Sequence, residues 1–494
     1  MPVPARTPGP SLVADQSIVA PGLRMDTIHR FADHERGRVG CQFDPTRRGL
    51  VCVTDLRSSD WHRKGVRLVR VDPATFAIEE RVVAQHFHGS FLWGDFNRDG
   101  APDFWGFSDE LDDADARAVL YLATSDPWTF RETRPIVIDH PVLGGAVLDA
   151  DGDGCEDVLL LGTGWEFQSN RAVQYFPDEL HRGDCRGGFH LANRELGLDR
   201  LPDFTGNPAP ARLGRTATVT DLDGDGRSDL VVGNYRAQPD SFLRSDRAGH
   251  FVRWAGDPDR DPRRQYFGHA VGLFPADLAA RGRLDLVVFN LWHGDDRGAV
   301  TDRSYALRVD ERGESTRIEL PQPLEAPFGG AVADFDGDGL PDVLLATAHR
   351  GPPYEGHALL VRNGRVAWRD EADWLKLRET PTIVDLDLDG APDLIGDGRV
   401  LAQRPEAGRR WIGFAFVGRS LSGSTGVLED ETGGRRAFAM ASDGRGQPGN
   451  LLTLGLGAHA RPRRLVLRDG ASGREHIVDL RGLACGRYFQ VTVE

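Results

Sequence analysis

Pairs of short apolar segments recur along this chain, and each pair flanks an acidic turn. The segment before the turn reads GGAVLD or GGAVAD, and the segment after it reads DVLLLG, DLVVGN, DLVVFN or DVLLAT. More alternating segments follow each pair, whereas the helical period of about 3.6 residues is nearly absent. Short apolar runs bounded by turn residues are typical of β-strands. The pattern therefore predicts an all-β chain.

The acidic turns share one motif, D-x-[DN]-x-D-G-x-x-D. Five copies begin at Asp95, Asp149, Asp221, Asp334 and Asp385. A sixth copy, Asp277–Asp285, has diverged and keeps only the outer aspartates and the glycine. Neighbouring first aspartates lie between 51 and 72 residues apart, a spacing that indicates a repeat fold. Four strands per repeat match the blade of a β-propeller.

We therefore predict a seven-bladed β-propeller over residues 26–403, with six blades as the alternative count. Residues 38–85 contain strand-like runs but no acidic turn, and we expect them to complete the seventh blade. Strands from both chain ends would then close the ring. Alternation in RRLVLRDG and HIVDLRG predicts a small β-sandwich over residues 404–494. Residues 1–25 are expected to form a flexible tail.

The acidic turns are interpreted as cation sites, because alternate positions of the motif can direct oxygen atoms at one point. Ca²⁺ accepts about six to eight oxygen ligands in irregular geometry, and without a cation such carboxylates repel one another. The glycine at position 6 permits the sharp turn. A solvated acidic turn would explain one copy but not five in register. The EF-hand alternative needs flanking helices and a glutamate at position 12. We expect about five structural Ca²⁺ ions, held by Asp95, Asn97, Asp99, Asp103, Asp149, Asp151, Asp153, Asp157, Asp221, Asp223, Asp225, Asp229, Asp334, Asp336, Asp338, Asp342, Asp385, Asp387, Asp389 and Asp393.

The diverged copy is expected to hold no calcium. Arg281 stands at the position of its third ligand. Either the guanidinium takes the place of the cation, or the loop packs without a metal.

A second set of candidates lies where the first strand of each repeat begins and the second strand ends. In a propeller these points share the rim opposite the acidic turns. Histidines there could bind one transition metal or act as acid–base groups; the alternatives are a recognition pocket without catalysis, or ordinary polar loops. The candidates are His88, His140, Arg215, His269 and Glu379 before first strands, and His293 and His349 after second strands, beside Trp165, Trp292, Tyr235 and Arg236.

Charge and cysteine content narrow the function classes. A formal charge of −15 without a basic stripe disfavours nucleic acid as a partner, and no run of about 18 apolar residues exists that could span a membrane. Five scattered cysteines lack metal spacing. A Cys41–Cys52 disulfide is one option, but free buried thiols are expected. The first residues lack the apolar core of a secretory signal, so a cytoplasmic location is expected, with the periplasm or secretion as the alternative if a signal was removed.

Two family resemblances follow from these motifs. The segments FGGAVADFDGDGLPD (Phe328–Asp342) and LGGAVLDADGDG (143–154) resemble the FG-GAP/VCBS repeat family, over roughly residues 90–400. That resemblance implies calcium loops between the first and second strands of each blade. The segments WIGFAFVG, LLTLGLG and RRLVLRDGASGRE resemble the ASPIC/UnbV domain, although SLSGSTGV (420–427) departs from its pattern. This domain follows such propellers in the cartilage acidic protein family and in bacterial relatives, some of which are associated with enediyne biosynthesis.

The function expected from the sequence is ligand binding by a calcium-stabilised propeller. The ligand would be a small molecule, a glycan or a protein, bound on the rim rich in histidine, aromatic residues and arginine. The alternative is a metal-dependent lyase, isomerase or cyclase acting at the channel mouth on a natural product or a sugar. The resemblance supports this alternative only by analogy, because some propellers of the family act on sugars.

Overall fold

The structure is a computed structural model in which nearly all of the described residues lie in strands or tight turns. It describes residues 17–20, 23–30, 39–45, 49–57, 64–86, 88–108, 117–162, 176–200, 211–212, 214–234, 238–246, 248–254, 269–291, 303–310, 314–320, 327–347, 359–362, 364–369, 380–396, 398–419, 421–440, 449–458 and 460–493.

Six sheets in the described residues each contain four antiparallel strands that follow one another along the chain. In order, their strands are β3 (Val39–Asp44), β4 (Gly49–Arg57), β5 (Lys64–Val71) and β6 (Ile78–Ala84); β7 (Ser90–Gly94), β8 (Asp103–Phe107), β9 (Ala118–Ala123) and β10 (Phe130–Thr133); β11 (Val142–Leu148), β12 (Asp157–Gly162), β14 (Glu179–Gly183) and β15 (Phe189–Leu191); β17 (Gly214–Thr220), β18 (Asp229–Asn234), β19 (Ser241–Ser245) and β20 (Phe251–Arg253); β21 (Ala270–Ala276), β22 (Asp285–Asn290), β23 (Tyr305–Val309) and β24 (Ser315–Glu319); β25 (Pro327–Ala333), β26 (Asp342–Thr347), β27 (Leu359–Arg362) and β28 (Arg365–Arg369).

A further sheet joins the two ends of the repeat region. Its order is β1 (Ser17–Ala20), β2 (Leu23–Arg30), β31 (Arg399–Gln403), β30 (Asp393–Gly396) and β29 (Thr382–Val384). The expected closure by strands from both chain ends is therefore present. Ser17–Ala20 and residues 23–25, which the predicted flexible tail included, pair within this sheet, so the tail prediction is wrong for these residues. Met25 is fully buried in a cluster with Leu394 and Leu401, and this burial fixes the segment.

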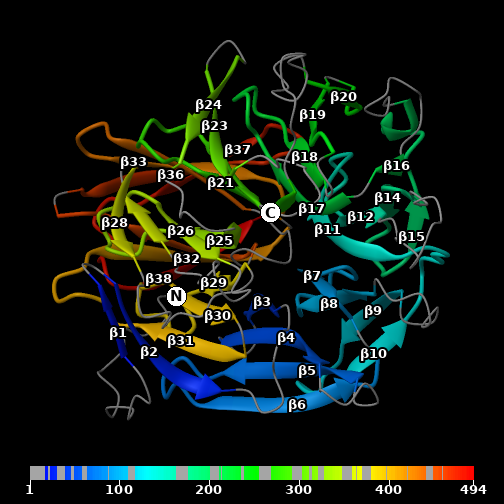
Figure 1. Ribbon diagram of the computed structural model, residues 1–494, viewed down its shortest axis with the longest axis horizontal. Helices are drawn as coiled ribbons and strands as arrows, with labels where there is room; N and C mark the ends of the chain where they lie inside the picture. The colour runs from blue at the N-terminus through cyan, green and yellow to red at the C-terminus, as the bar shows by residue number, and fades with distance from the viewer. Residues whose placement is uncertain are drawn as a thin grey trace, which may run out of the picture.

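The first strands of these sheets contact one another in a closed sequence. β3 contacts β7, and the contacts continue through β11, β17, β21, β25 and β29 back to β3. Figure 1 shows the sheets following one another around a circle, from blue through green to yellow. This arrangement is consistent with a propeller-like fold; the count of seven blades stays a prediction.

The second strand of each sheet shows why the repeats pack in this way. All six residues of β18 are buried. Leu230 and Val232 pack into a cluster with residues of the preceding sheet, whereas Val231 packs into a cluster with residues of the following sheet. Successive side chains of a strand point to opposite faces, so an unbroken apolar run is needed where both faces are covered.

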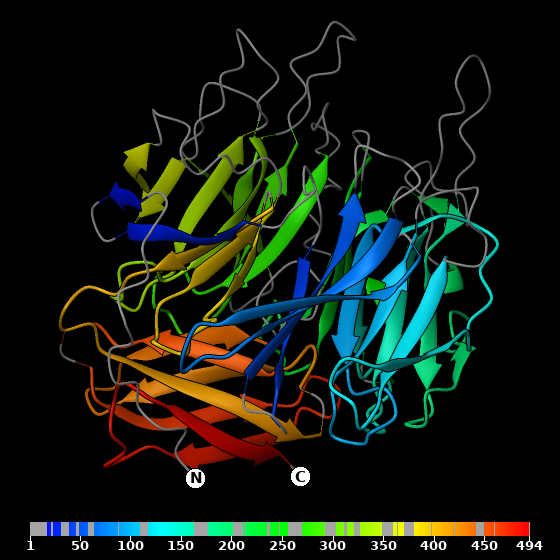
Figure 2. The same ribbon diagram turned by 90° about the horizontal axis from the view of Figure 1, so that it is seen from below.

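Residues 404–494, called the C-terminal domain below, form two sheets. The first has the order β35 (Leu451–Gly455), β32 (Trp411–Gly418) and β38 (Tyr488–Val493). The second has the order β34 (Arg435–Ala439), β33 (Thr425–Asp430), β36 (Pro462–Arg468) and β37 (Glu475–Asp479). Phe414 and Leu465 share one buried cluster between them, as expected for a β-sandwich. Figure 2 shows this domain, in orange and red, against one end of the repeat sheets.

The cysteines correct the expectation of free buried thiols. Cys41 and Cys52 lie opposite each other in β3 and β4 and form a disulfide. Cys155 and Cys185 form a second disulfide, and Cys485 is free. The prediction failed because pairing depends on strand register and on contacts between distant segments, which the spacing of cysteines does not reveal.

Candidate metal-binding loops

The acidic motifs form the turns between first and second strands, as the sequence predicts. They are called the first (95–103), second (149–157), third (221–229), fourth (334–342) and fifth (385–393) loops, and residues 277–285 are the diverged loop. In every one, the Oδ2 atom of the first aspartate accepts a hydrogen bond from the backbone N–H of the glycine at position 6, over 2.7–3.0 Å. These glycines all have positive φ, which confirms why the turn requires them.

Position 4 of each loop is also left-handed, a feature that the motif itself does not reveal. Three loops have glycine there, with φ of 77–81°. The other three have Arg98, Ala280 and Leu388, with φ of 49–57°. All six loops therefore share one backbone shape, including the diverged loop. A side chain at such a φ costs about 1–2 kcal/mol, so glycine at position 4 is the less strained choice.

Four loops bring three carboxylates together. Within the part of the chain that the structure describes, four groups of His, Cys, Asp or Glu have ligand atoms within 4.8 Å of one another, and all four are aspartate triads. They are Asp149, Asp151 and Asp157; Asp221, Asp223 and Asp225; Asp334, Asp336 and Asp338; and Asp385, Asp387 and Asp393. Clustered carboxylate oxygens are the ligands of hard cations such as Ca²⁺, so several loops fit a metal ion.

The first loop differs from the other four motif copies. It is not among these triads, and Asn97 replaces an aspartate at position 3 and donates to Asp99 over 2.8 Å. Its expected ligands Asp95, Asn97, Asp99 and Asp103 thus stay a prediction.

The aspartate at position 9 of each loop is buried. In the second and fifth loops it accepts hydrogen bonds both from the loop itself and from the third strand of the sheet. Asp157 accepts from Ala150 N at 2.8 Å and from Gly183 N of β14 at 2.9 Å. The fifth loop repeats the pattern, because Asp393 accepts from Leu386 N at 2.8 Å and from Gln403 N at 2.8 Å. The ninth position therefore fixes the loop against the third strand of its sheet.

Burial makes these carboxylates difficult to ionise without a cation. Loss of solvent raises the pKa of Asp103 to about 8 and the pKa of Asp157, Asp342 and Asp385 to about 7. Neighbouring aspartates raise these pKa values further. A bound cation would favour the charged form and so compensate both effects.

Arginines on several third strands face the turn at the end of the first strand of the same sheet, and they were not among the predicted site residues. Arg182 pairs with Asp151 and lies 3.7 Å from Asp153. The others repeat this pattern from equivalent strands: Arg244 lies 3.5 Å from Asp223, Arg362 lies 3.0 Å from Asp342, Arg308 lies 3.1 Å from Asp285 and Arg70 lies 3.2 Å from Asp44. The signal was available in the sequence as an arginine near the end of β5, β14, β19, β23 and β27, whereas β9 has no arginine.

Arginines pair with the aspartate at position 9 of the diverged loop. Arg281 pairs with Asp285, which Arg308 also contacts through two nitrogens at 3.1 and 3.2 Å. These contacts are consistent with a guanidinium in the place of a cation, and the absence of calcium from this loop stays a prediction.

A glutamate connects two neighbouring loops. Glu156 of the second loop accepts a hydrogen bond from Asp95 N of the first loop at 2.6 Å. Next to it, the Cys155–Cys185 disulfide joins the second loop to the turn after β14. The motif gave no sign of either link.

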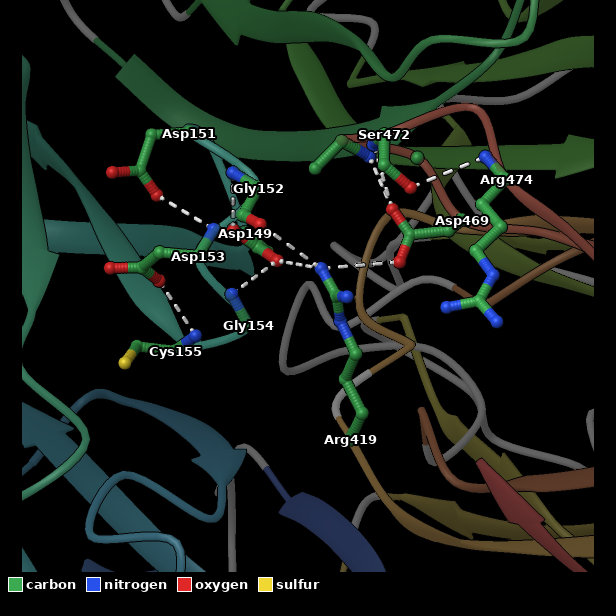
Figure 3. A network of polar contacts seen from close by, with 12 residues as sticks. Asp149, Asp151, Gly152, Asp153, Gly154, Cys155, Arg419, Asp469, Ser472 and Arg474 are labelled. Atoms are coloured by element: carbon green, nitrogen blue, oxygen red, sulfur yellow. Dashed lines mark hydrogen bonds and ion pairs between the residues drawn. The ribbon is translucent and has the colours of Figure 1, made fainter. Parts of the chain in front are cut away.

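The C-terminal domain contacts this same rim. Arg419 lies 2.9 Å from Asp149 of the second loop and 3.3 Å from Asp469, as Figure 3 shows. Tyr488 OH donates to Asp385 of the fifth loop at 2.6 Å. The rim with the acidic loops is thus an interface between the two parts of the chain.

The expected histidine rim is only partly described. His293, His349 and Glu379 lie outside the described residues, as do Trp165, Trp292, Tyr235 and Arg236. His88 is fully buried and bonds Tyr121 OH at 2.8 Å. His140 is buried, stacks on Phe176 and lies 3.2 Å from Asp139.

The remaining rim candidates are His269 and Arg215. His269 is buried just before β21, and Arg215 is half-buried in β17. Among the described residues, no group of three metal-binding side chains includes a histidine. A catalytic or transition-metal role at this rim stays a prediction.

Strands, loops and rim together define the class of protein. Residues 213–243, which span the third loop and its flanking strands, match the FG-GAP repeat family. This segment therefore matches an FG-GAP repeat, within a chain whose fold is all-β and propeller-like.

Its curated relatives fall into two groups. The T-cell immunomodulatory protein of Rattus norvegicus is 24% identical over 319 residues, which are 62% of this chain and 46% of that protein. Cartilage acidic protein 1 of Xenopus tropicalis is 29% identical over 141 residues, which are 27% of this chain and 20% of that protein. The chain spans less than half of the length of these relatives.

Solved structures add only a weak likeness. A fungal alcohol oxidase of the AA5 family, in complex with copper, superposes with a TM-score of 0.45 at 9% identity, over 92% of this chain and 99% of that chain. Such a score carries no argument.

Among the described residues, no helix has the length and apolar character needed to cross a membrane.

Proposed function

We propose that this protein is a calcium-stabilised propeller that binds a small molecule, a glycan or a protein on the rim opposite the acidic loops. The observation that carries the calcium assignment is the convergence of three carboxylates in each of four loops of one shape. Oxygen-only ligand sets favour Ca²⁺ or Mg²⁺, and Ca²⁺ tolerates the irregular geometry of such loops. The first loop, with Asn97 in place of one aspartate, would be a fifth and weaker site.

The cation would act structurally. Asp149, Asp151 and Asp157 would hold it in the second loop, and the equivalent aspartates would hold it in the third, fourth and fifth loops. There it would neutralise carboxylates that are otherwise buried at a cost in free energy. The protein's own groups bind and orient: backbone amides fix the first aspartate, and the third-strand arginine balances part of the charge.

The rim assignment rests on where the C-terminal domain lies. Its contacts with the repeat sheets include those at the acidic loops and one at the neighbouring end of β3, where Asn450 bonds Phe43 at 2.8 and 3.1 Å. The opposite rim is therefore the end that we assign to a partner. Because the enzyme alternative lacks a supporting contact among the described residues, we propose no second function.

A calcium-dependent melting experiment tests the structural role. Full-length protein is melted with excess calcium, with EDTA, and with EDTA followed by excess calcium. Stabilisation should be on the order of 2.7 kcal/mol per site at a calcium concentration about 100 times Kd. Identical melting temperatures in the three conditions would contradict the proposal.

A ligand screen tests the binding rim. Glycans and small molecules are tested for thermal stabilisation at saturating calcium, and each positive ligand is repeated with Arg215→Ala. A rim ligand should lose affinity with this variant, and unchanged affinity for all positive ligands would contradict the rim assignment.

We further propose an oxidising compartment, the periplasm or the extracellular space. The disulfides Cys41–Cys52 and Cys155–Cys185 support this location, because disulfides persist mainly where thiols are not kept reduced. Loops with calcium affinities typical of extracellular modules would also fill there. Thiol counting in denatured, unreduced protein purified from its native source should give one free thiol per chain, that of Cys485; five would contradict the proposal.

A further inference from the structure

The C-terminal domain of the same chain contacts the rim that carries the acidic loops. Several of these contacts reach the same atom of the loop motif. In four loops a group of the C-terminal domain reaches the Oδ2 atom of the first aspartate. Arg419 reaches Asp149 at 2.9 Å, Arg468 reaches Asp221 at 3.8 Å, Ala437 N donates to Asp277 at 3.0 Å and Tyr488 OH donates to Asp385 at 2.6 Å. The same carboxylates belong to the candidate metal triads in three of these loops.

Other contacts depend on the backbone shape of the loops rather than on their charge. Ser228 N of the third loop donates to Gly470 O at 2.7 Å, and its hydroxyl donates to Gly423 O at 2.6 Å. Gly457 N donates to Gly337 O of the fourth loop at 3.1 Å. Arg409 donates to Asp334 O and Phe335 O at 2.8 and 2.9 Å. These bonds form only while the loops keep the turn seen here.

Arginines from both the repeat sheets and the C-terminal domain balance part of the negative charge of the loops. In the second loop four carboxylates face Arg182 from the same sheet and Arg419 from the C-terminal domain. In the third loop four carboxylates face Arg244 and Arg468. In both loops the carboxylates outnumber these arginines, so net negative charge is left that a cation could balance.

We propose that cation binding to the loops and docking of the C-terminal domain reinforce each other. This inference rests on the proposed calcium binding. The cation keeps the crowded carboxylates in the turn conformation, and that conformation presents the backbone groups and Oδ2 atoms to which the domain binds. By thermodynamic linkage, docking must raise cation affinity by the same factor by which the cation strengthens docking.

Coulomb's law alone argues for the opposite sign, because a cation and a guanidinium compete for one carboxylate. We assign the positive sign because the contacts of the third, fourth and fifth loops include backbone and hydroxyl donors that carry no charge. Tyr488 is the clearest case. This residue is only 2% exposed, and its hydroxyl group donates to the first aspartate of a fully buried triad.

Hydrogen–deuterium exchange of the full chain tests the docking half. Exchange is followed at residues 419–424, 451–457 and 468–473, with calcium and with EDTA. The inference expects calcium to slow exchange in all three segments by several-fold. Calcium that binds but leaves exchange in these segments unchanged, or accelerates it, would overturn the coupling and leave the proposed function intact. Absence of calcium binding would overturn both.

A variant tests the reciprocal half. Tyr488→Phe removes the hydroxyl group and keeps the ring that packs on Trp411. We expect calcium affinity, measured by competition with a chromophoric chelator, to fall by about threefold to tenfold at one site. Arg481→Ala is the matched control, because Arg481 pairs with Asp479 on the outer surface and is 68% exposed. Equal affinities of Tyr488→Phe and Arg481→Ala would contradict the inference.

A second variant keeps the inference testable if Tyr488→Phe does not fold. Arg468→Ala removes a partly exposed guanidinium 3.8 Å from Asp221. The inference expects faster exchange at residues 468–473 in calcium, and wild-type exchange there would overturn it.

Discussion

The diverged loop and the fifth loop have the same backbone shape but differ in the groups that face their carboxylates. In both, the first aspartate accepts from the amides of positions 5 and 6, at 2.7–2.9 Å. In the diverged loop two carboxylates face Arg281 and Arg308. In the fifth loop a buried triad receives a neutral hydroxyl from Tyr488. The turn can therefore form where arginines balance the charge of its aspartates. In the fifth loop, under the proposed function, a cation would balance that charge and so keep the turn.

The largest expected effect concerns pH in the absence of metal. Burial raises the folded-state pKa of Asp385 to about 7, above its unfolded value near about 4. Such a group stabilises the folded state fully below about pH 4, and this contribution is lost as the pH rises through about 7. In EDTA, the free energy of unfolding should fall between pH 5.5 and 8 by about 2 kcal/mol for Asp385 alone. The total fall should be larger, because Asp103, Asp157 and Asp342 have similarly raised pKa values.

Denaturant titrations at several pH values measure this effect. Excess calcium should reverse the trend above pH 7, because it holds the carboxylates ionised. A free energy of unfolding in EDTA that rises across this range would contradict the assignment of buried, unneutralised carboxylates.

The next effect separates the fifth loop from the diverged one. Asp387→Asn removes one charge from the buried triad. With calcium, we expect a loss of about 2–3 kcal/mol in the free energy of unfolding, because one site is emptied. In EDTA the loss should vanish or change sign, since a buried negative charge has gone. Asp139→Asn is the control, at a side chain that is 98% exposed; equal losses with and without calcium would argue against a metal role.

Converting the diverged loop into a copy of the fourth is a gain-of-site test. Ala279→Asp with Arg281→Asp restores the motif around Asp277 and Asp285, and Arg308 still faces it. In EDTA this variant should be less stable by about 2 kcal/mol, because Asp285 loses one partner. With calcium it should bind one additional ion. The uncharged pair Ala279→Asn with Arg281→Asn should bind none, and an unchanged calcium count in the aspartate variant would show that the motif alone does not make a site.

The smallest effect concerns backbone strain at position 4, where the diverged loop and the fifth loop both have a residue other than glycine at positive φ. Ala280 is exposed with φ of 49°. Ala280→Gly should stabilise the protein by about 0.5–1 kcal/mol, with or without calcium. A destabilised variant in thermal melts would mean that the left-handed turn is not strained.

Local patterns predicted the repeats well. The spacing of Asp221, Asp223, Asp225 and Asp229 between apolar runs was enough to predict a turn between two buried strands. This prediction succeeded because a turn and its flanking strands are determined by about ten consecutive residues.

Contacts between distant segments were not predictable in the same way. Closure by strands from both chain ends was expected from the repeat, but no local pattern marks Leu23–Arg30 as the strand that pairs with Arg399–Gln403. The docking of Arg419 on Asp149 depends on how two separately folded parts meet. The Cys155–Cys185 disulfide likewise depends on how one turn lies over another. The histidine candidates were predicted from strand ends alone, which says nothing of burial; His88 fills the space beside Gly106.

Counting the calcium ions bound per chain tests the central claim most directly. Full-length protein is saturated with calcium, freed of excess ion by gel filtration and analysed for its elements. The account predicts at least four calcium ions per chain, one for each aspartate triad, and five if the first loop also fills. One ion or none would contradict the claim that these loops are calcium sites.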